Sequence, residues 1–348
     1  MPIQQTSFEN HEILDRYVKR HPKACLYQLS GWARVIQQSY GHNIYSLSIL
    51  DPYDSNKLSG ALTVAHLRHP FFGNTLVSMP YADIGGTLSD TPEAEDQLLA
   101  QAIDLAHRLG ASIELRHTQP LSNTPANCTT RAHKSRMLLK IPDSSESLMR
   151  SFKSKLRSQI NRPIKEGLTS AIGGVELVDE FYQIFLENMR DLGSPVHSKR
   201  LFQNVMAEFR NSARIFIVRK GSQAVASSLA IGFNDTLQNP WSSSLRRFSH
   251  FSPNMLLYWS MLEYAADNGF SRFDFGRSTP GEGTYKFKEQ WGAEPEPLYW
   301  QTIGLGPAVT DSDSDLKKSF QMAGAVWKHL PIAFTRIVGP SIRKYISL

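Results

Sequence analysis

The chain has 348 residues, of which 41% are hydrophobic and 20% are charged, a composition typical of a globular protein that excludes a disordered one. Its two cysteines are too few for a disulfide framework or a structural zinc site. The net charge of +6 and the pI near 9.2 favour anionic partners such as phosphates, nucleic acid or an acidic membrane face.

The sequence gives no sign of export or membrane insertion. No run approaches the roughly 20 apolar residues that a membrane span requires. Residues 1–15 are polar and include acids, so they do not predict a secretory signal. Because cysteines are few, we expect a cytoplasmic protein.

The first part of the chain predicts a mixed α/β unit. A polar stretch at 118–131 follows it, and this stretch has no periodicity and predicts a loop. Apolar periodicity predicts helices at 8–19, 32–39 and 92–109, and strands at 44–50, 60–67, 76–81 and 112–116.

The second part repeats this order of elements. Helix, helix, strand, hairpin, strand, helix, glycine and strand follow one another in both parts, although the two sequences differ. The predicted elements are a strand at 137–141, a basic helix from 145, helices at 178–192, 199–209 and 254–268, and strands at 213–219, 224–233 and 272–275.

The segment F-D-F-G-R-S at 273–278 is the most informative motif, and Y-K-F-K at 285–288 and W-G at 291–292 follow it. Acids, cations, glycines and aromatics after a strand fit a polar pocket, because buried charges are paired or used in chemistry. A strand, a turn and the start of an amphipathic helix would explain the same residues without a site. The D-F-G triplet does not indicate a kinase, because the Gly-rich loop and the H-R-D loop are both missing.

A basic segment before the second group of elements is another candidate. Several cations held close together can bind a phosphate, and arginine can do so through two hydrogen bonds. A solvated helix face would give the same pattern, and Pro163 should kink or end the helix. The cations are Lys153, Lys155, Arg157, Arg162 and Lys165.

Other catalytic patterns are missing or poorly placed. Gln301, Gly304 and Gly306 match a Q-x-x-G-x-G loop for the pyrophosphate of coenzyme A, but an acidic run that would repel an anion follows. The histidines lack metal-ligand spacing such as H-E-x-x-H, and no G-x-S-x-G elbow is present. We therefore expect no metal and no serine nucleophile.

The order and spacing of these motifs resemble the FemAB family, and within it the branch associated with PEP-CTERM/exosortase and exopolysaccharide systems. The resemblance covers nearly the whole chain and is strongest from Met149 to Trp300. The matching stretches are L-R-S-Q-I-N-R at 156–162, K-E-G-L at 165–168, the helix from 254, F-D-F-G at 273–276, F-K at 287–288 and W-G at 291–292.

The resemblance implies an α/β (α+β) fold of two tandem GNAT-like domains, which are acyl-CoA N-acyltransferase-like, with mixed sheets flanked by helices. We expect the N-terminal GNAT-like domain at 1–145 and the C-terminal GNAT-like domain, with the main site motifs, at 146–305. A C-terminal helical tail would occupy 306–348 and pack either on the first domain or on a membrane.

The resemblance also implies transfer of an acyl or aminoacyl group to an amine, with no permanently bound cofactor. The donor would be acyl-CoA or aminoacyl-tRNA, and the acceptor an amine-bearing envelope precursor or small molecule. Relatives that use tRNA often carry a long helical arm that this sequence lacks, and Asn161 stands where a basic residue is common, so acyl-CoA stays open. The alternative is a non-catalytic accessory protein of an envelope polysaccharide system.

The hypothesis of an acyltransferase gives roles to particular residues, of which Phe287-Lys288 matches the Phe-Lys motif of the family. Lys288 in the Phe-Lys motif would stabilise the oxyanion that develops on the donor. Asp274 would orient or deprotonate the amine, or pair with Arg277, and Tyr285 would orient the leaving group. The residues expected to bind substrate or phosphate are Arg157, Arg162, Lys165, Arg277, Ser278 and Trp291.

The last block combines apolar residues with cations. Helical spacing at 316–330 is followed by the interrupting residues Pro331 and Pro340. Apolar residues flanked by lysines and arginines fit peripheral contact of 316–348 with a membrane. Packing of the same face on the protein's own domains would explain the pattern equally well.

Overall fold

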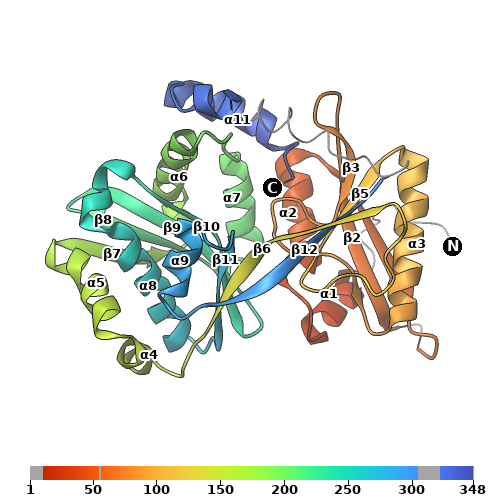
Figure 1. The fold of residues 1–348 in the computed structure, drawn as a ribbon, viewed down its shortest axis with the longest axis horizontal. Helices are drawn as coiled ribbons and strands as arrows, with labels where there is room; N and C mark the ends of the chain where they lie inside the picture. Colours follow the sequence, from red (N-terminus) through yellow and green to blue (C-terminus); the bar gives the residue numbers. More distant parts are fainter. Residues whose placement is uncertain (1–10, 55, 305–321, 348) are drawn as a thin grey trace. The chain divides into compact units, whose positions relative to one another are not determined.

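The computed structural model describes residues 11–54, 56–304 and 322–347. By their contacts they divide into two compact units (Figure 1). Unit 1 comprises the described residues of 1–135, 297–312 and 344–348, and unit 2 those of 136–296 and 313–343. The chain passes from one unit to the other within β6 (Cys128–Lys140) and within β12 (Glu294–Ile303). The continuous domains expected at 1–145, 146–305 and 306–348 stay a prediction beside these discontinuous units.

Unit 1 is built on a mixed sheet with the strand order β1-β2-β3-β5-β12 and with β4 beside β2. β1, β2 and β3 are successive antiparallel neighbours, whereas β3 is parallel to β5. The helix α3 contributes Leu98 and Leu105 to an apolar cluster with Leu62 and Ile113 of the sheet. The elements are α1 (His11–Arg20), η2 (Leu26–Gln28), α2 (Ser30–Tyr40), β1 (Asn43–Leu50), β2 (Leu58–His69), β3 (Gly73–Val77), β4 (Leu88–Ser89), α3 (Pro92–Leu109) and β5 (Ser112–His117).

Unit 2 has a sheet with the order β6-β11-β10-β9-β8-β7, in which β7 to β10 are antiparallel neighbours and β10 is parallel to β11. Its further elements are α4 (Ser145–Ser151), α5 (Ser154–Lys165), β7 (Leu168–Gly173), η3 (Val175–Leu177), α6 (Val178–Leu192), α7 (Lys199–Glu208), β8 (Ala213–Lys220), β9 (Gln223–Phe233), β10 (Thr236–Ser244), η4 (Arg246–Phe251), α8 (Pro253–Asp267), β11 (Arg272–Ser278), α9 (Gly283–Glu289) and α11 (Ile332–Arg343).

Helices cover both faces of the sheet of unit 2 (Figure 1). Ala226 on β9 lies in one apolar cluster with Leu257 of α8. The next residue, Ser227, donates a hydrogen bond to the carbonyl oxygen of Phe181 on α6. Because successive side chains of a strand point to opposite faces, α6 and α8 lie on opposite sides of this sheet.

The two units share one order of elements and one pairing scheme. In each, an antiparallel hairpin leads to a third strand, and a helix then returns the chain to a strand parallel to the third. A left-handed glycine follows this helix in both units, Gly110 with φ 60° and Gly269 with φ 77°. The predicted internal repeat and the fold class of two mixed α/β units are confirmed.

Several strands were not predicted, because their sequences are polar, exposed or proline-containing and do not show the alternation of a strand. β6 begins at Cys128, inside the segment predicted to be a loop, because most of its first residues are exposed and polar. β10 contains Pro240 and three serines, a composition typical of a turn, yet it is a central strand. β7 and β12 were not predicted either, since β7 is short and polar and β12 contains two prolines among its first residues.

The basic segment forms two helices instead of one. Phe152 is extended between α4 and α5, with ψ 144°. The guanidinium of Arg157 donates to the carbonyl oxygens of Arg150 (3.4 Å) and Phe152 (3.2 Å) and so stabilises the break. α5 continues through Pro163 and ends at Lys165, so the proline lies in the last turn of the helix.

The tail is divided between the units. α11 contacts α6 and buries Thr335 and Gly339, despite Pro340 within the helix. The residues after it belong to unit 1, where the hydroxyl of Tyr81 donates to the carbonyl oxygen of Lys344 at 2.5 Å. Of the predicted helix at 316–330, residues 316–321 lie outside the described residues. No helix in the described ranges is long and apolar enough to cross a membrane.

Candidate active site

The strands β10 and β11 are paired with each other over only part of their length. Three residue pairs join them, and the last is Gln238 with Asp274. β10 then continues to Ser244 and β11 to Ser278 without further pairing between the two strands. A register shift in the β9–β10 pairing between Gln238 and Trp241 marks the same level. The strands therefore separate next to the F-D-F-G motif.

A glycine turn in β11 lies at this separation, and two charged side chains hold it. Gly276 has φ +73°, a left-handed conformation that costs other residues roughly 1–2 kcal/mol. Its N–H donates to Asp274 Oδ1 at 2.8 Å. Lys288 Nζ, from α9, donates to the carbonyl oxygens of Gly276 (3.0 Å) and Arg277 (2.7 Å). Asp274 and Lys288 thus bind opposite sides of one peptide segment.

Asp274 also belongs to a charged group that crosses three neighbouring strands, β11, β6 and β12. Arg136 on the middle strand β6 lies 3.7 Å from Asp274 Oδ2 and forms an ion pair with Glu296 on β12. Arg136 and Asp274 are largely buried, and Glu296 is partly exposed. One cation therefore balances two carboxylates at the site, which buried charges require.

A buried hydroxyl and amide network lies on the β10 side. Ser228 Oγ donates to Asn239 Oδ1 at 2.6 Å, and Asn239 Nδ2 donates to Ser242 Oγ at 2.8 Å. Burial raises the pKa of Tyr258 on α8, while hydrogen bonds to Ser242 and Asn239 act in the opposite direction. The phenol therefore stays protonated at neutral pH and can donate. Gln238 is also buried, and its Oε1 has no hydrogen-bond partner among the described residues.

The β11–α9 segment brings together the residues predicted there. Lys288 and Asp274 are each 7% exposed. Ser278 is buried, and its hydroxyl has no partner in the described part of the chain. Arg277 is half-buried beside the carbonyl that Lys288 binds, and Tyr285 is half-buried against the apolar cluster of α8.

The predicted phosphate-binding cations of α5 do not converge. Arg157 binds carbonyl oxygens at the α4–α5 break. Arg162 Nη2 donates to the carbonyl oxygen of His250 at 3.2 Å, just before α8. Lys165 is exposed at the end of the helix. These three side chains therefore do not form one phosphate pocket.

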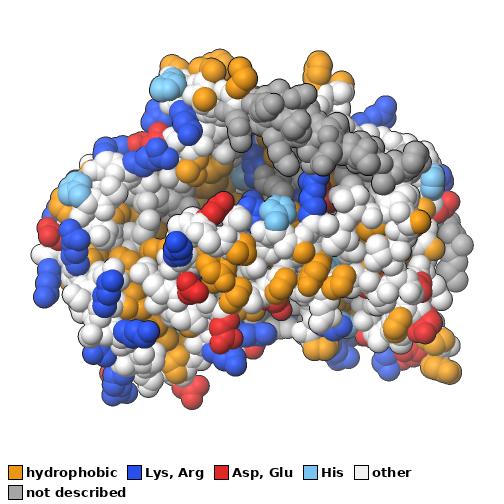
Figure 2. All heavy atoms as spheres, viewed as in Figure 1, with side chains coloured by type: hydrophobic (Ala, Val, Ile, Leu, Met, Phe, Trp, Pro, Cys, Tyr) orange, Lys and Arg blue, Asp and Glu red, His pale blue; other side chains and the backbone are white. Residues whose placement is uncertain are grey.

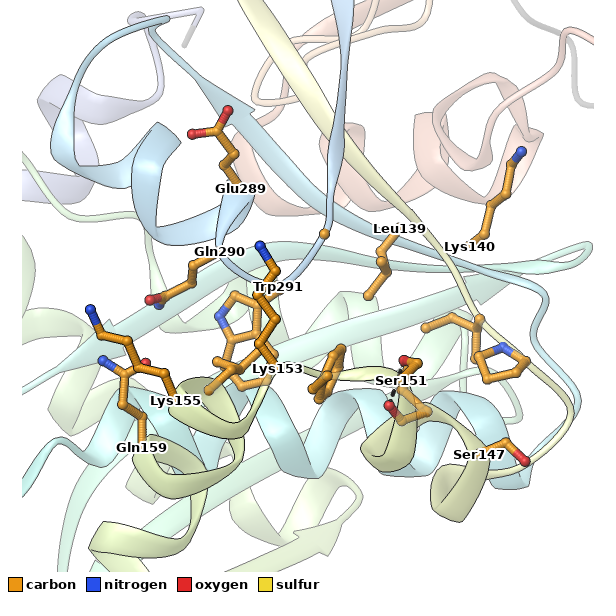
Figure 3. Close-up of a pocket in the computed structure, with 16 residues that line it drawn as sticks. Leu139, Lys140, Ser147, Ser151, Lys153, Lys155, Gln159, Glu289, Gln290 and Trp291 are labelled. Atoms are coloured by element: carbon orange, nitrogen blue, oxygen red, sulfur yellow. Dashed lines mark hydrogen bonds between the residues drawn. The ribbon is translucent and has the colours of Figure 1, made fainter.

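Trp291 has a different neighbourhood. It is 1% exposed, and its ring lies 5.7 Å from that of Phe152 and 6.3 Å from that of Phe287. It lines a cavity at the start of α5, together with Lys153 and Lys155 (Figure 3). Lys288 and Asp274 do not line this cavity.

Sequence reasoning missed Arg136, Glu296 and the β10 network. Arg136 precedes Met137 in a strand whose first half reads as a loop, and Glu296 lies about 160 residues further on. The serines of β10 gave a signal, since three serines and an asparagine beside a tryptophan are unusual for a central strand. The sequence analysis did not assign a strand there, so this signal was not used. No group of histidine, cysteine or carboxylate side chains in the described ranges could hold a metal ion.

Comparison with known proteins agrees with this geometry. The acetyltransferase (GNAT) domain family matches residues 150–289. No curated protein matches the sequence. The chain is similar to the crystal structure of FemX, with 16% identity and a TM-score of 0.65 over 86% of this chain and 97% of that chain.

Two further solved structures have the same fold. One is the C-terminal domain of a putative lysylphosphatidylglycerol synthetase from Agrobacterium fabrum, with 12% identity and a TM-score of 0.55 over 91% of this chain and 96% of that chain. The other is a tandem GNAT protein from the clavulanic acid biosynthesis pathway, with 13% identity and a TM-score of 0.53 over 86% and 94%. The chain thus has the tandem GNAT fold that its motifs predicted.

Replacing Arg136 by methionine tests the charged group. Without the cation, Asp274 and Glu296 lose their shared partner, and we expect the free energy of unfolding to fall by about 2–3 kcal/mol. Chemical denaturation measures this loss. Arg200→Met, which removes an exposed cation of the same unit, should change stability by no more than about 0.5 kcal/mol. Equal stabilities of the two variants would show that the charged group does not hold the strands.

Proposed function

We propose that this protein is an N-acyltransferase that moves an acyl or aminoacyl group from an activated donor to an amine. The GNAT domain at 150–289 supports the reaction class. The similarity to the structures of FemX and of the C-terminal domain of a putative lysylphosphatidylglycerol synthetase supports a role in cell-envelope synthesis. The exopolysaccharide connection rests on the resemblance of the motifs to one branch of the FemAB family, and the cytoplasmic location rests on the low number of cysteines. Both are part of the proposal.

The separation of β10 from β11 beside Lys288 is the observation that carries this proposal. Beyond Gln238 and Asp274, the facing edges of the two strands are not hydrogen-bonded to each other. An acyl donor with amide groups in its arm, such as acyl-CoA, can pair with such an edge. The donor carbonyl would then lie near the turn that Lys288 holds.

The chemistry needs few groups. The amine nitrogen attacks the donor carbonyl, a C–N bond forms, and the C–S bond of a thioester or the C–O bond of an aminoacyl ester breaks. Lys288 would stabilise the negative charge on the carbonyl oxygen, and its burial strengthens this interaction. Asp274 would orient the amine instead of deprotonating it, because its two oxygens already interact with the N–H of Gly276 and with Arg136. The proton of the amine passes to the leaving group or to water.

The phosphates of the donor would lie near the N-terminus of α8. Arg162 lies at this end of the helix, bound to the carbonyl oxygen of His250. Lys220 lies close by, with its Nζ 4.8 Å from the centre of the Phe251 ring. Ser252 caps the helix without a side-chain hydrogen bond, and the positive end of the helix dipole favours an anion there. Either coenzyme A or tRNA would supply that anion.

The second candidate is an accessory protein without catalytic activity. Burial of Lys288 against two carbonyl oxygens would also suit a purely structural lysine. Incubation with radiolabelled acyl-CoA, and separately with charged tRNA, in the presence of a cell lysate distinguishes the two functions. Transfer of label into an amine product supports the enzyme, and no transfer from either donor supports the accessory protein.

Lys288→Met should lower the turnover of this transfer by about a hundredfold or more, because methionine keeps the apolar stem and removes the charge. Lys286→Met is the matched control, since Lys286 lies on the same short helix and is exposed. Its turnover should equal that of the wild type. A thermal melt of each variant separates lost chemistry from lost folding. Normal turnover in a folded Lys288→Met protein would remove this lysine from the mechanism.

We also propose that the end of the chain contacts a membrane peripherally, without crossing it. α11 packs on α6 and buries Thr335 and Gly339, whereas Phe334 and Ile337 are 47% and 72% exposed. Figure 2 shows hydrophobic side chains at the top of the view, over α11. Met322 and Val326 are exposed as well, and so are the cations Lys328 and Arg336. Exposed apolar groups with neighbouring cations fit the surface of an anionic bilayer.

Phe334→Ser with Ile337→Ser should reduce sedimentation with phosphatidylglycerol vesicles by about tenfold or more, because the apolar anchor is removed. Ile172→Ser with Val175→Ser, a pair of similarly exposed apolar residues elsewhere in unit 2, should leave binding unchanged. Binding should weaken with added salt. Absence of vesicle binding by the wild-type protein, or equal binding by both variants, contradicts this role of α11.

A further inference from the structure

Unit 2 contains a cavity that the proposed acyl transfer does not use. It has a volume of about 810 Å³ and lies between the end of β6, the helices α4 and α5, and the turn at 289–292 (Figure 3). Asp274, Lys288 and the serines of β10 are not among its lining residues. It also lies at the opposite end of α5 from Arg162.

One side of this cavity is suited to an anion. Lys153 and Lys155 extend from the start of α5 on this side, whereas Lys140 points away from them (Figure 3). Glu289 is the one acid that lines the cavity within the described residues, and its carboxylate also points away from the two lysines (Figure 3). The local charge is therefore positive, which favours a phosphate over a neutral ligand.

The N-terminus of α5 adds hydrogen-bond donors to this side. The helix has 12 residues, and its N-cap, Lys153, provides no side-chain cap. The first N–H groups of such a helix lack acceptors within the helix and carry partial positive charge. Together with Lys153 and Lys155, these N–H groups form the kind of arrangement that binds phosphate at the N-termini of many helices.

Trp291 is an independent sign of a ligand. Its side chain is 1% exposed and lines the cavity, yet its indole N–H has no acceptor among the described residues. Figure 3 shows the indole nitrogen on the side where Lys155, Gln159 and Gln290 lie. A buried donor without an acceptor is unfavourable, and a bound acceptor would remove that cost.

The floor of the cavity is apolar and fits an organic group next to the phosphate. Phe152 and the ring of Trp291 provide aromatic surface, and Leu139, Ile141 and Leu156 provide aliphatic surface. We propose that this cavity binds a phosphorylated organic molecule. Its phosphate lies between Lys153, Lys155 and the start of α5, and its apolar part lies on the aromatic floor. The site is separate from the one that holds the acyl donor.

Calorimetric titration of the full-length protein with phenyl phosphate tests this inference, because the probe combines an anion with an aromatic ring. Lys153→Met with Lys155→Met should weaken binding by about tenfold or more. Lys165→Met, at the other end of α5, should bind as the wild type does. Inorganic phosphate should bind more weakly than phenyl phosphate, because it leaves the floor empty.

Three results would overturn the inference. They are no saturable binding of phenyl phosphate by the wild type, equal affinity in the double lysine variant, and binding of inorganic phosphate at least as tight as that of phenyl phosphate. A parallel titration with coenzyme A separates this site from the donor site. The affinity for coenzyme A should not change in the double lysine variant. Because both titrations measure binding alone, their outcome does not depend on whether the protein transfers acyl groups. An equal loss for coenzyme A and phenyl phosphate would show that the cavity is part of the donor site.

Discussion

The turn at Gly276 is the constraint on which the proposed site depends. A left-handed glycine bends β11 where β10 leaves it, and Asp274 and Lys288 hold the peptide from its N–H and its carbonyl sides. Lys288 reaches this turn because α9 packs Phe287 and the following Trp291 against α8, with ring distances of 5.0 Å from Tyr258 to Phe287 and 6.4 Å from Tyr258 to Trp291. The apolar packing of one helix thereby fixes the position of the charge that the proposed reaction requires.

The motif F-D-F-G and the motif F-K are two parts of the same interaction, the one that holds the turn at Gly276. Asp274 and Gly276 are two residues apart on a strand, and Lys288 follows after one turn and a short helix. Local sequence alone places these residues close together. For that reason, the sequence could predict this group of side chains without a structure.

The rest of the site depends on contacts between distant segments, which no local pattern encodes. Arg136 and Glu296 meet because β6 lies between β11 and β12, and part of β6 has the composition of a loop. The cations of α5 appeared to be one phosphate site because they are close in sequence. The break at Phe152 and the carbonyl partners of Arg157 and Arg162 direct them to different places. The alternation of helices and strands was predictable, because apolar periodicity survives in α3, α6 and α7.

Hydrogen–deuterium exchange with and without donor tests the central claim most directly. If the donor pairs with the separated strand edges, an excess of acetyl-CoA or of aminoacyl-tRNA should slow exchange at least tenfold in peptides that cover 239–244 and 275–278. Peptides from the paired part of β8 and β9 serve as the internal reference and should not change. Unchanged exchange in both segments with both donors, at concentrations that saturate binding, would contradict the account.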